Sequence, residues 1–137
     1  MKNNKGFTLV EIISVIGILV VIALVAVPSI ISISNNNKEK NYQKTVDLIV
    51  TSAENYYHND IDKTKLLDNE SCYVTLKDLT ISKYLKAPIT NPKTNDKLDL
   101  MTYVKITKNV DENDIITIDY EYVNDINMEG LNKCYSK

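Results

Sequence analysis

The stretch that decides the fold is KGFTLVEIISVIGILVVIALVAVPSIISI, residues 5–33. A short lysine-bearing leader runs directly into a long apolar segment with one acid, Glu11, near its start, and the next charged residue is Lys38. At about 1.5 Å per residue, residues 7–33 form a helix long enough to cross a hydrocarbon core of about 30 Å. The run is too long for the apolar core of a secretory signal peptide, which has about 7–15 residues. The stretch therefore predicts a membrane-spanning helix.

Glu11 is the exceptional residue of this segment. A carboxylate inside an apolar spanning helix costs free energy, and such residues are usually paired and functional. One interpretation is a side chain that reaches the lipid headgroups near Lys2 and Lys5, just upstream. The other interpretation is a specific contact with a positive partner elsewhere. The residues alone leave both open.

The motif formed by residues 5–11 and the following apolar helix resembles the prepilin leader of type IV pilins and type II secretion pseudopilins. The resemblance implies that residues 1–6 are a leader, that prepilin peptidase cleaves between Gly6 and Phe7, and that Phe7 becomes N-methylated. Glu11 is then the fifth residue of the mature chain, where the family's glutamate meets the N-terminal amine of a neighbouring subunit. The implied partners are the peptidase, identical or related pilin subunits, and an inner-membrane assembly platform.

This resemblance agrees with elementary physics. A buried carboxylate needs a partner, and a contact between different surfaces of identical subunits propagates into an open helical filament instead of closing a ring. We therefore interpret Glu11 as an assembly residue. We expect Glu11→Val to leave folding and membrane insertion intact and to reduce assembly.

The apolar segment is followed by an amphipathic pattern that continues the helix. Apolar residues recur at spacings of three and four, which predicts one helix over residues 7–58. Pro28 lies inside it and removes a backbone donor, so we expect a kink there. In type IV pilins the segment before such a proline can unwind; the alternative is a plain kink in a membrane helix. The apolar residues of the amphipathic part form a stripe along one face of this helix, and they are Tyr42, Val46, Ile49, Val50, Ala53, Tyr56 and Tyr57.

Residues 59–137 are predicted to form a small head. After a polar loop at 59–70, Thr75 and Asp78 approximate a capping box before a short helix that ends near Leu85. Residues 91–96 have the composition of a turn. Alternating residues predict strands at 100–108 and 114–123, joined as an antiparallel hairpin whose apolar face covers the helix stripe, and 124–137 is expected to be irregular. The predicted fold class is α+β and pilin-like, a long N-terminal helix packed against a small antiparallel sheet.

Cys72 and Cys134 are the two cysteines of the chain. An even count in a part of the chain predicted to be extracytoplasmic favours a disulfide. The alternative is two separate buried thiols in a reducing compartment. Their distance in sequence excludes a redox or zinc-binding motif with closely spaced cysteines.

Composition argues against several function classes. The net charge is −2 and all sixteen basic residues are lysine, which disfavours nucleic-acid binding because phosphate recognition needs clustered positive charge. His58 is the only histidine, and we interpret it as a surface residue near a helix end. We find no nucleophile-base pair, phosphate loop, cofactor motif or metal-ligand cluster. The sequence predicts no enzymatic activity, no cofactor and no metal.

Two groups of residues have alternative interpretations. Asp111, Glu112 and Asp114 are interpreted as a solvated acidic turn, with weak calcium binding as the alternative. Exposed tyrosines favour sticky interfaces, so an adhesive surface is a second hypothesis. The tyrosines left over from predicted apolar faces are Tyr73, Tyr84, Tyr103 and Tyr135.

The predicted function is a type IV pilin-like structural subunit. It is held in the cytoplasmic membrane by a single span before assembly and becomes part of an extracellular filament afterwards. One alternative is a pseudopilin of a type II secretion or competence DNA-uptake system. Another is a non-polymerising, single-pass membrane-anchored binding protein.

Overall fold

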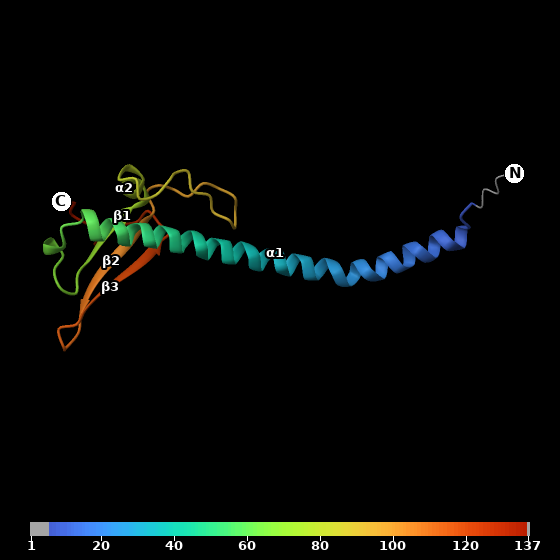
Figure 1. Ribbon diagram of the computed structural model, residues 1–137, viewed down its shortest axis with the longest axis horizontal. Coiled ribbons are helices and arrows are strands. Elements are labelled where there is room, and N and C mark those ends of the chain that lie inside the picture. The colour runs from blue at the N-terminus through green and yellow to red at the C-terminus, as the bar shows by residue number, and fades with distance from the viewer. Residues whose placement is uncertain (1–5, 137) are drawn as a thin grey trace. The chain divides into compact units, whose positions relative to one another are not determined.

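The computed structural model describes residues 6–136 (Figure 1). This part of the chain forms two compact units that divide between Glu39 and Lys40. One helix, α1, contributes to both units. In chain order the elements are α1 (Leu9–Asp60), the 3₁₀ turn η1 (Lys63–Lys65), β1 (Ser71–Thr75), α2 (Leu76–Ile81), β2 (Tyr103–Val110), β3 (Ile116–Val123) and β4 (Asn132–Lys133).

The first unit is the apolar part of α1. The helix continues through Pro28 without ending, although the proline has no N–H to donate to the preceding turn. Two serine hydroxyls in this part donate back to the helix: Ser14 Oγ lies 2.7 Å from the Val10 carbonyl oxygen and Ser29 Oγ 3.2 Å from that of Val25. Such bonds satisfy hydroxyl groups in an apolar setting.

The second unit contains a four-stranded sheet in the order β3-β2-β1-β4. β1–β2 and β2–β3 are antiparallel, and β1–β4 is parallel, with Cys72 opposite Asn132 and Tyr73 opposite Lys133. The predicted β2–β3 hairpin is confirmed. The predicted α+β, pilin-like architecture is confirmed. The sheet is mixed and not antiparallel throughout, because β4 pairs in parallel with β1, and β4 lies within residues 124–137, which were expected to be irregular. β4 has two residues, too few to produce a readable alternation.

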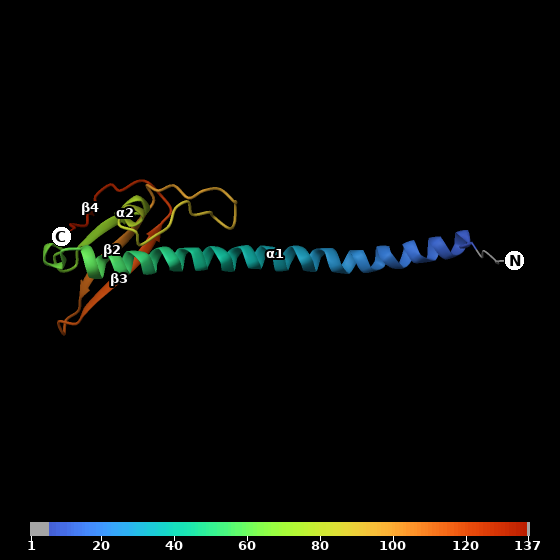
Figure 2. The same ribbon diagram turned by 45° about the horizontal axis from the view of Figure 1, so that its top comes forward.

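The last turns of α1 form the core with one face of the sheet (Figure 2). Ile49 and Ala53 of α1 are fully buried, as are Val104 and Ile106 of β2. Tyr120 of β3 packs against this core while partly exposed. The expected packing of the hairpin's apolar face on the helix stripe is therefore confirmed.

α2 begins directly where β1 ends. Thr75 is the last residue of β1 and the N-cap of α2, and its hydroxyl and the Asp78 carboxylate form the predicted capping box. The helix ends at Ile81, four residues before the predicted end at Leu85. Lys83 has a φ of 64°, a left-handed conformation that terminates a helix.

The long connection after α2 is a folded loop. The predicted turn at 91–96 is present, with the Asn95 N–H 2.8 Å from the Asn91 carbonyl oxygen. Lys93 Nζ lies 4.2 Å from the centre of the Tyr42 ring on α1, a cation–π contact within the second unit. Ile89 and Leu98 at the base of the loop are buried.

Candidate processing and assembly site

The residues before α1 are exposed. Phe7 has 81% of its surface exposed, and Leu9 and Val10 that follow have 77% and 72%. None of the most apolar 18-residue window of α1 is buried inside the protein, and by length and composition this helix is a candidate membrane span. Lys2 and Lys5, the lysines of the headgroup interpretation of Glu11, lie outside the described residues.

Glu11 forms a capping box with Thr8 at the start of α1. Glu11 Oε2 accepts the Thr8 N–H at 3.4 Å and the Thr8 hydroxyl at 3.5 Å, while the Glu11 N–H donates to Thr8 Oγ1 at 3.2 Å. The first bond of the helical ladder joins the Ile12 N–H to the Thr8 carbonyl oxygen. The carboxylate is therefore placed at the helix N-terminus, where negative charge is favourable.

The two bonds that the Glu11 carboxylate accepts in this capping box use the same oxygen, Oε2. Within residues 6–136, no hydrogen-bond donor is bonded to Oε1. The geometry leaves one carboxylate oxygen open to a donor from outside the chain. This box was not predicted from the sequence, although its Thr-x-x-Glu spacing is the same kind of signal as the spacing at Thr75.

Gly6 is not required by its surroundings in the structure. A β-carbon at this position would meet no atom within 4 Å, and the backbone is not in the left-handed region. Neither packing nor conformation of the described chain therefore explains a glycine immediately before Phe7. A requirement for glycine here would have to come from another molecule.

Residues 1–27 match the family model described as the prokaryotic N-terminal methylation motif. This chain carries the hallmark of type IV pilins and pseudopilins. The matched motif contains Gly6, Phe7, Thr8 and Glu11, and the pilin-like fold continues beyond it as a long helix followed by a small mixed sheet. Comparison with curated proteins and with solved structures gave no significant match.

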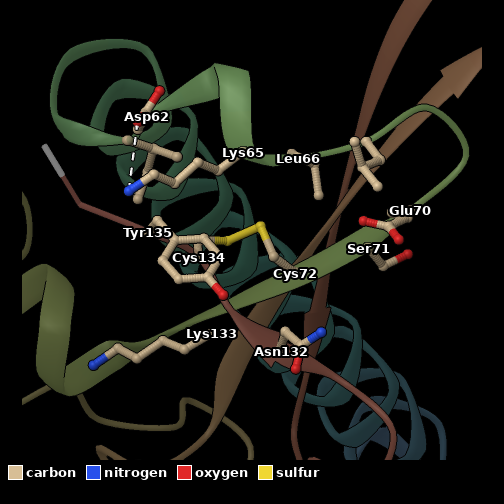
Figure 3. A pocket seen from close by; sticks show the side chains of 12 residues that line it. Asp62, Lys65, Leu66, Glu70, Ser71, Cys72, Asn132, Lys133, Cys134 and Tyr135 are labelled. Carbon is tan, nitrogen blue, oxygen red and sulfur yellow. Dashed lines mark ion pairs between the residues drawn. A yellow bond between two sulfur atoms is a disulfide. The ribbon is translucent and has the colours of Figure 1, made fainter.

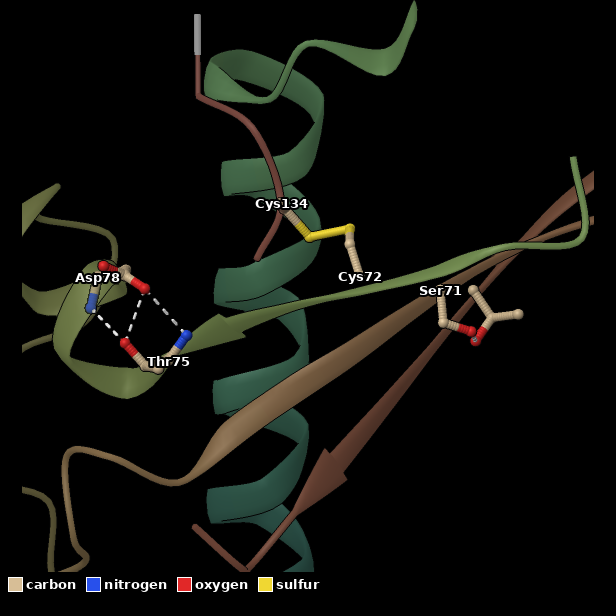
Figure 4. Close-up of a disulfide and its surroundings, with 6 residues drawn as sticks. Ser71, Cys72, Thr75, Asp78 and Cys134 are labelled. Carbon is tan, nitrogen blue, oxygen red and sulfur yellow. Dashed lines mark hydrogen bonds between the residues drawn. A yellow bond between two sulfur atoms is a disulfide. The ribbon is translucent and has the colours of Figure 1, made fainter. Parts of the chain in front are cut away.

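The disulfide expected from the sequence joins Cys72 of β1 to Cys134, with an S–S bond of 2.00 Å and a Cα–Cα distance of 5.0 Å (Figure 4). It closes a separation of 62 residues, nearly the whole pilin-like head. The Cys134 N–H also donates to the Tyr73 carbonyl oxygen at 3.0 Å. The C-terminal segment is thus attached to β1 by covalent and backbone bonds.

A pocket of ≈ 120 Å³ lies beside the disulfide (Figure 3). Asp62 and Lys65 form an ion pair of 3.8 Å on one side, and Lys65 Nζ lies 5.2 Å from the centre of the Tyr135 ring. Across residues 6–136, no group of three or more His, Cys, Asp or Glu side chains is arranged to hold a metal ion. The pocket offers no convergent catalytic set.

The four tyrosines left for the adhesive hypothesis do not form an exposed set. Tyr103 has only 5% of its surface exposed, and its hydroxyl donates to the Asn127 carbonyl oxygen at 3.0 Å. Tyr73 stacks edge-to-face on Tyr103 at 5.8 Å, and Tyr84 stacks similarly on Tyr56 at 5.5 Å. Tyr135 alone among the four is mainly exposed. The prediction that Tyr103 is available for surface contacts is wrong, because its ring packs against Tyr73 and its hydroxyl is bonded to the segment that contains Asn127.

Two other candidates have mainly structural contacts. His58 is exposed near the end of α1, with Nε2 4.0 Å from Glu54 Oε1 and Nδ1 3.2 Å from Lys63 Nζ. Asp111 Oδ1 accepts the backbone N–H groups of Asn113 and Ile115, each at 2.8 Å. These backbone bonds lower the pKa of Asp111. The carboxylate therefore organises the hairpin loop.

Proposed function

We propose that this protein is a type IV pilin-like structural subunit of an extracellular filament. Its leader, residues 1–6, is removed by prepilin peptidase between Gly6 and Phe7, and the new N-terminal residue is methylated. Before assembly a single span, residues 7–33, holds it in the cytoplasmic membrane. The observation that carries the proposal is the methylation motif at residues 1–27 on a helix whose apolar side chains are exposed.

The exposed apolar helix supports polymerisation. Large apolar side chains along the first unit are 46–81% exposed, far more contiguous apolar surface than a soluble monomer exposes. Lipid covers such a surface in a membrane, and equivalent helices of neighbouring subunits cover it in a filament core. Both environments are apolar, so the subunit passes from one to the other without exposing the helix to water.

Glu11 is proposed to pair with the N-terminal amine of a neighbouring subunit through Oε1. The capping box is a competing role for the same residue, and the two roles separate by substitution. Glu11→Gln keeps a capping box, since glutamine serves there as well as glutamate, and removes the charge. We expect Glu11→Gln to assemble as poorly as Glu11→Val. Normal assembly of Glu11→Gln beside defective Glu11→Val would assign the residue to capping alone.

The experiment that tests processing is mass spectrometry of the N-terminus of protein purified from native membranes and from the sheared surface fraction. We expect a chain that begins with methylated Phe7, and a Gly6→Val control that retains its leader. An intact Met1 in the wild-type protein would overturn the proposal in favour of a simple membrane-anchored binding protein.

The methylation motif supports a pseudopilin of a secretion or DNA-uptake system as directly as it supports a type IV pilin, because pilins and pseudopilins share the motif. Both are structural proteins, and both are proposed to reach their polymer through an inner-membrane assembly platform. The length of the polymer separates them. Long fibres in the sheared surface fraction favour the pilus, whereas short polymers confined to the cell envelope favour the pseudopilus.

A kink at Pro28 belongs to the same proposal. The missing N–H leaves the Leu24 carbonyl without its helical donor, and a shallow apolar hollow lies beside it, lined by Val20, Ala23, Leu24, Val27 and Pro28. A helix with one bond fewer bends there more readily. Filaments of Pro28→Ala are expected to assemble and to differ in local helix geometry when imaged.

A further inference from the structure

The second unit carries an excess of negative charge at one edge of its sheet, where one acid, Glu121, is the cross-strand partner of Lys105 on β2. Every charged residue between Lys108 and Lys133 is acidic, and all of them are exposed. Five belong to β3 and to the hairpin loop before it, and we name these five the β3 acidic edge. They are Asp111, Glu112, Asp114, Asp119 and Glu121.

A positive surface lies on and just after α2. Between residues 76 and 92 the charged residues are three lysines and one acid, Asp78. The acid is already bonded to Lys133 Nζ at 2.7 Å. Lys77, Lys83 and Lys86 are exposed, and in the described part of the chain no acidic side chain lies within ion-pair distance of them. We name these three residues the α2 lysine face.

The topology separates the two surfaces. β3 is one edge strand, and β4 is the other. α2 starts at the end of β1 and is bonded to β4 through Asp78 and Lys133, so the α2 lysine face lies toward the edge opposite β3. The end of β1, where α2 starts, lies two strand spacings of about 4.8 Å, or about 10 Å, from β3, and this exceeds the screening length of about 8 Å at physiological salt. Neither surface therefore neutralises the other within one molecule.

Each surface also exposes a large apolar side chain. Ile116, the first residue of β3, has 59% of its surface exposed, and Ile81, the last residue of α2, has 68%. An apolar contact surrounded by charged groups is the common organisation of a protein interface. A contact of either surface with itself would instead place like charges opposite each other.

We propose that the β3 acidic edge of one copy binds the α2 lysine face of the next copy. The inference rests on the proposed polymerisation and adds a second contact, between heads, to the one made by the helix. Because the two surfaces differ and lie at opposite edges, the contact is heterologous and repeats from copy to copy as an open array. Complementary charge gives it direction and register.

Zero-length cross-linking of the full-length protein in native membranes and sheared fibres tests the contact. A carbodiimide joins lysines to carboxylates that already touch. We expect cross-links between copies that connect Lys77, Lys83 or Lys86 to the β3 acidic edge, and a strong decrease at 1 M salt, where the screening length is about 3 Å. Cross-links between heads that avoid these residues, or that join this chain only to other proteins, would overturn the inference.

Charge reversal provides the decisive comparison. One variant carries Glu112→Lys and Glu121→Gln, whose carboxylates make no hydrogen bond or ion pair within residues 6–136. Glu121 is only neutralised, because a lysine there would face its cross-strand partner Lys105. The other carries Lys83→Glu and Lys86→Glu. Each alone should lose the cross-link about five-fold, the effect of two exposed ion pairs of typical strength. Co-expression of the two variants, and a chain with all four changes, should restore it, because the introduced lysine meets the introduced glutamates.

The outcomes distinguish this inference from the proposed function. If each variant alone cross-links like the wild type, or if co-expression fails to restore the loss, the contact between heads is wrong. N-terminal processing and polymerisation through α1 would stand in either case. If wild-type protein carries an uncut leader and forms no polymer, the proposed function itself fails, and that result is read from the N-terminus without reference to the charge variants.

Discussion

Lys133 Nζ lies 2.7 Å from Asp78 Oδ1, so a side chain of the C-terminal strand is bonded to the first turn of a helix 55 residues earlier. The other oxygen of Asp78 accepts the Thr75 hydroxyl at 2.7 Å and the Thr75 N–H at 3.2 Å. One carboxylate thus connects the end of β1, the start of α2 and β4.

This carboxylate makes head stability depend on acid pH. Burial raises the pKa of Asp78, but the bonds from Lys133 and Thr75 outweigh burial and lower it overall. Because the folded pKa is below the unfolded value of about 3.9, the stabilisation is present above about pH 4 and disappears as the pH falls through the folded pKa. Asp78→Asn should be less stable than wild type at pH 7, and the difference should shrink below pH 4. A difference independent of pH, measured by denaturant unfolding, would contradict this assignment.

The N-cap of α2 gives a matched pair of variants. Thr75→Ala removes the hydroxyl that accepts the Asp78 N–H at 3.1 Å and should lower the free energy of unfolding by about 1 kcal/mol. Thr75→Ser keeps an oxygen in the same place and should lose much less. Equal losses for the two variants would show that the methyl group of this buried residue matters more than the cap. Urea unfolding of the full-length protein in detergent measures both.

The Tyr120 hydroxyl contrasts with the Thr75 hydroxyl, because it is a buried polar group whose removal should not destabilise the head. Within residues 6–136 the Tyr120 hydroxyl is the buried side-chain polar atom that lacks a hydrogen-bond partner. Tyr120→Phe should therefore leave stability unchanged or raise it by up to about 1 kcal/mol. The Tyr122 hydroxyl, 3.3 Å from Thr102 Oγ1, provides a control, and Tyr122→Phe should be destabilising. A marked loss of stability in Tyr120→Phe would indicate a partner for its hydroxyl.

The same tyrosine predicts a response to alkaline pH. Burial, followed by the negative charge of Glu54 and the nearby Tyr57, raises the pKa of Tyr120 to about 12. Its ordinary pKa is about 10, so the unfolded chain ionises first, and stability should fall as the pH rises from 10 to 12. Burial also raises the pKa of Tyr57, Tyr84 and Tyr122, so ultraviolet titration should detect several late-ionising tyrosines, and Tyr120→Phe should remove one of them. A full complement of tyrosines ionising near pH 10 would contradict this prediction.

The disulfide should stabilise the head and have no role in processing. In the chain-entropy model, closing a separation of 62 residues contributes about 4 kcal/mol. A variant with Cys72→Ala and Cys134→Ala should lose stability on this scale and still be cleaved and methylated at its N-terminus. Loss of N-terminal processing in a variant whose head remains folded would contradict the separation of these two parts.

Long periodic patterns and short motifs of fixed residue types, such as the capping box at Thr75, were predictable from the sequence, whereas the two shortest strands were not. The apolar run and the stripe through Ile49 and Ala53 extend over many turns, so both halves of α1 could be identified. β1 has five residues and β4 has two, so neither shows a period. β4 exists because Cys134 and its neighbours are bonded to β1, a tertiary constraint that local pattern does not contain.

The candidate site shows the same division. The motif around Gly6 and Phe7 was readable because it is a fixed order of residue types. The capping role of Glu11 could also have been predicted from its spacing to Thr8. The residue was interpreted through its charge alone, as an assembly residue. The burial of Tyr103 could not be predicted from its strand alone, because the residue that accepts the hydrogen bond from its hydroxyl, Asn127, lies 24 positions away.

The absence of buried side chains between Leu9 and Glu39 has an evolutionary consequence. In the described structure, no contact in that stretch belongs to the protein's own core, so an exchange of one apolar residue for another there leaves the head's stability unaffected. Selection on this half of the helix must then be exerted by whatever surrounds it. The head can diverge for as long as it keeps its own core and the complementary charges of its two proposed contact surfaces, so the two halves of α1 evolve under different constraints.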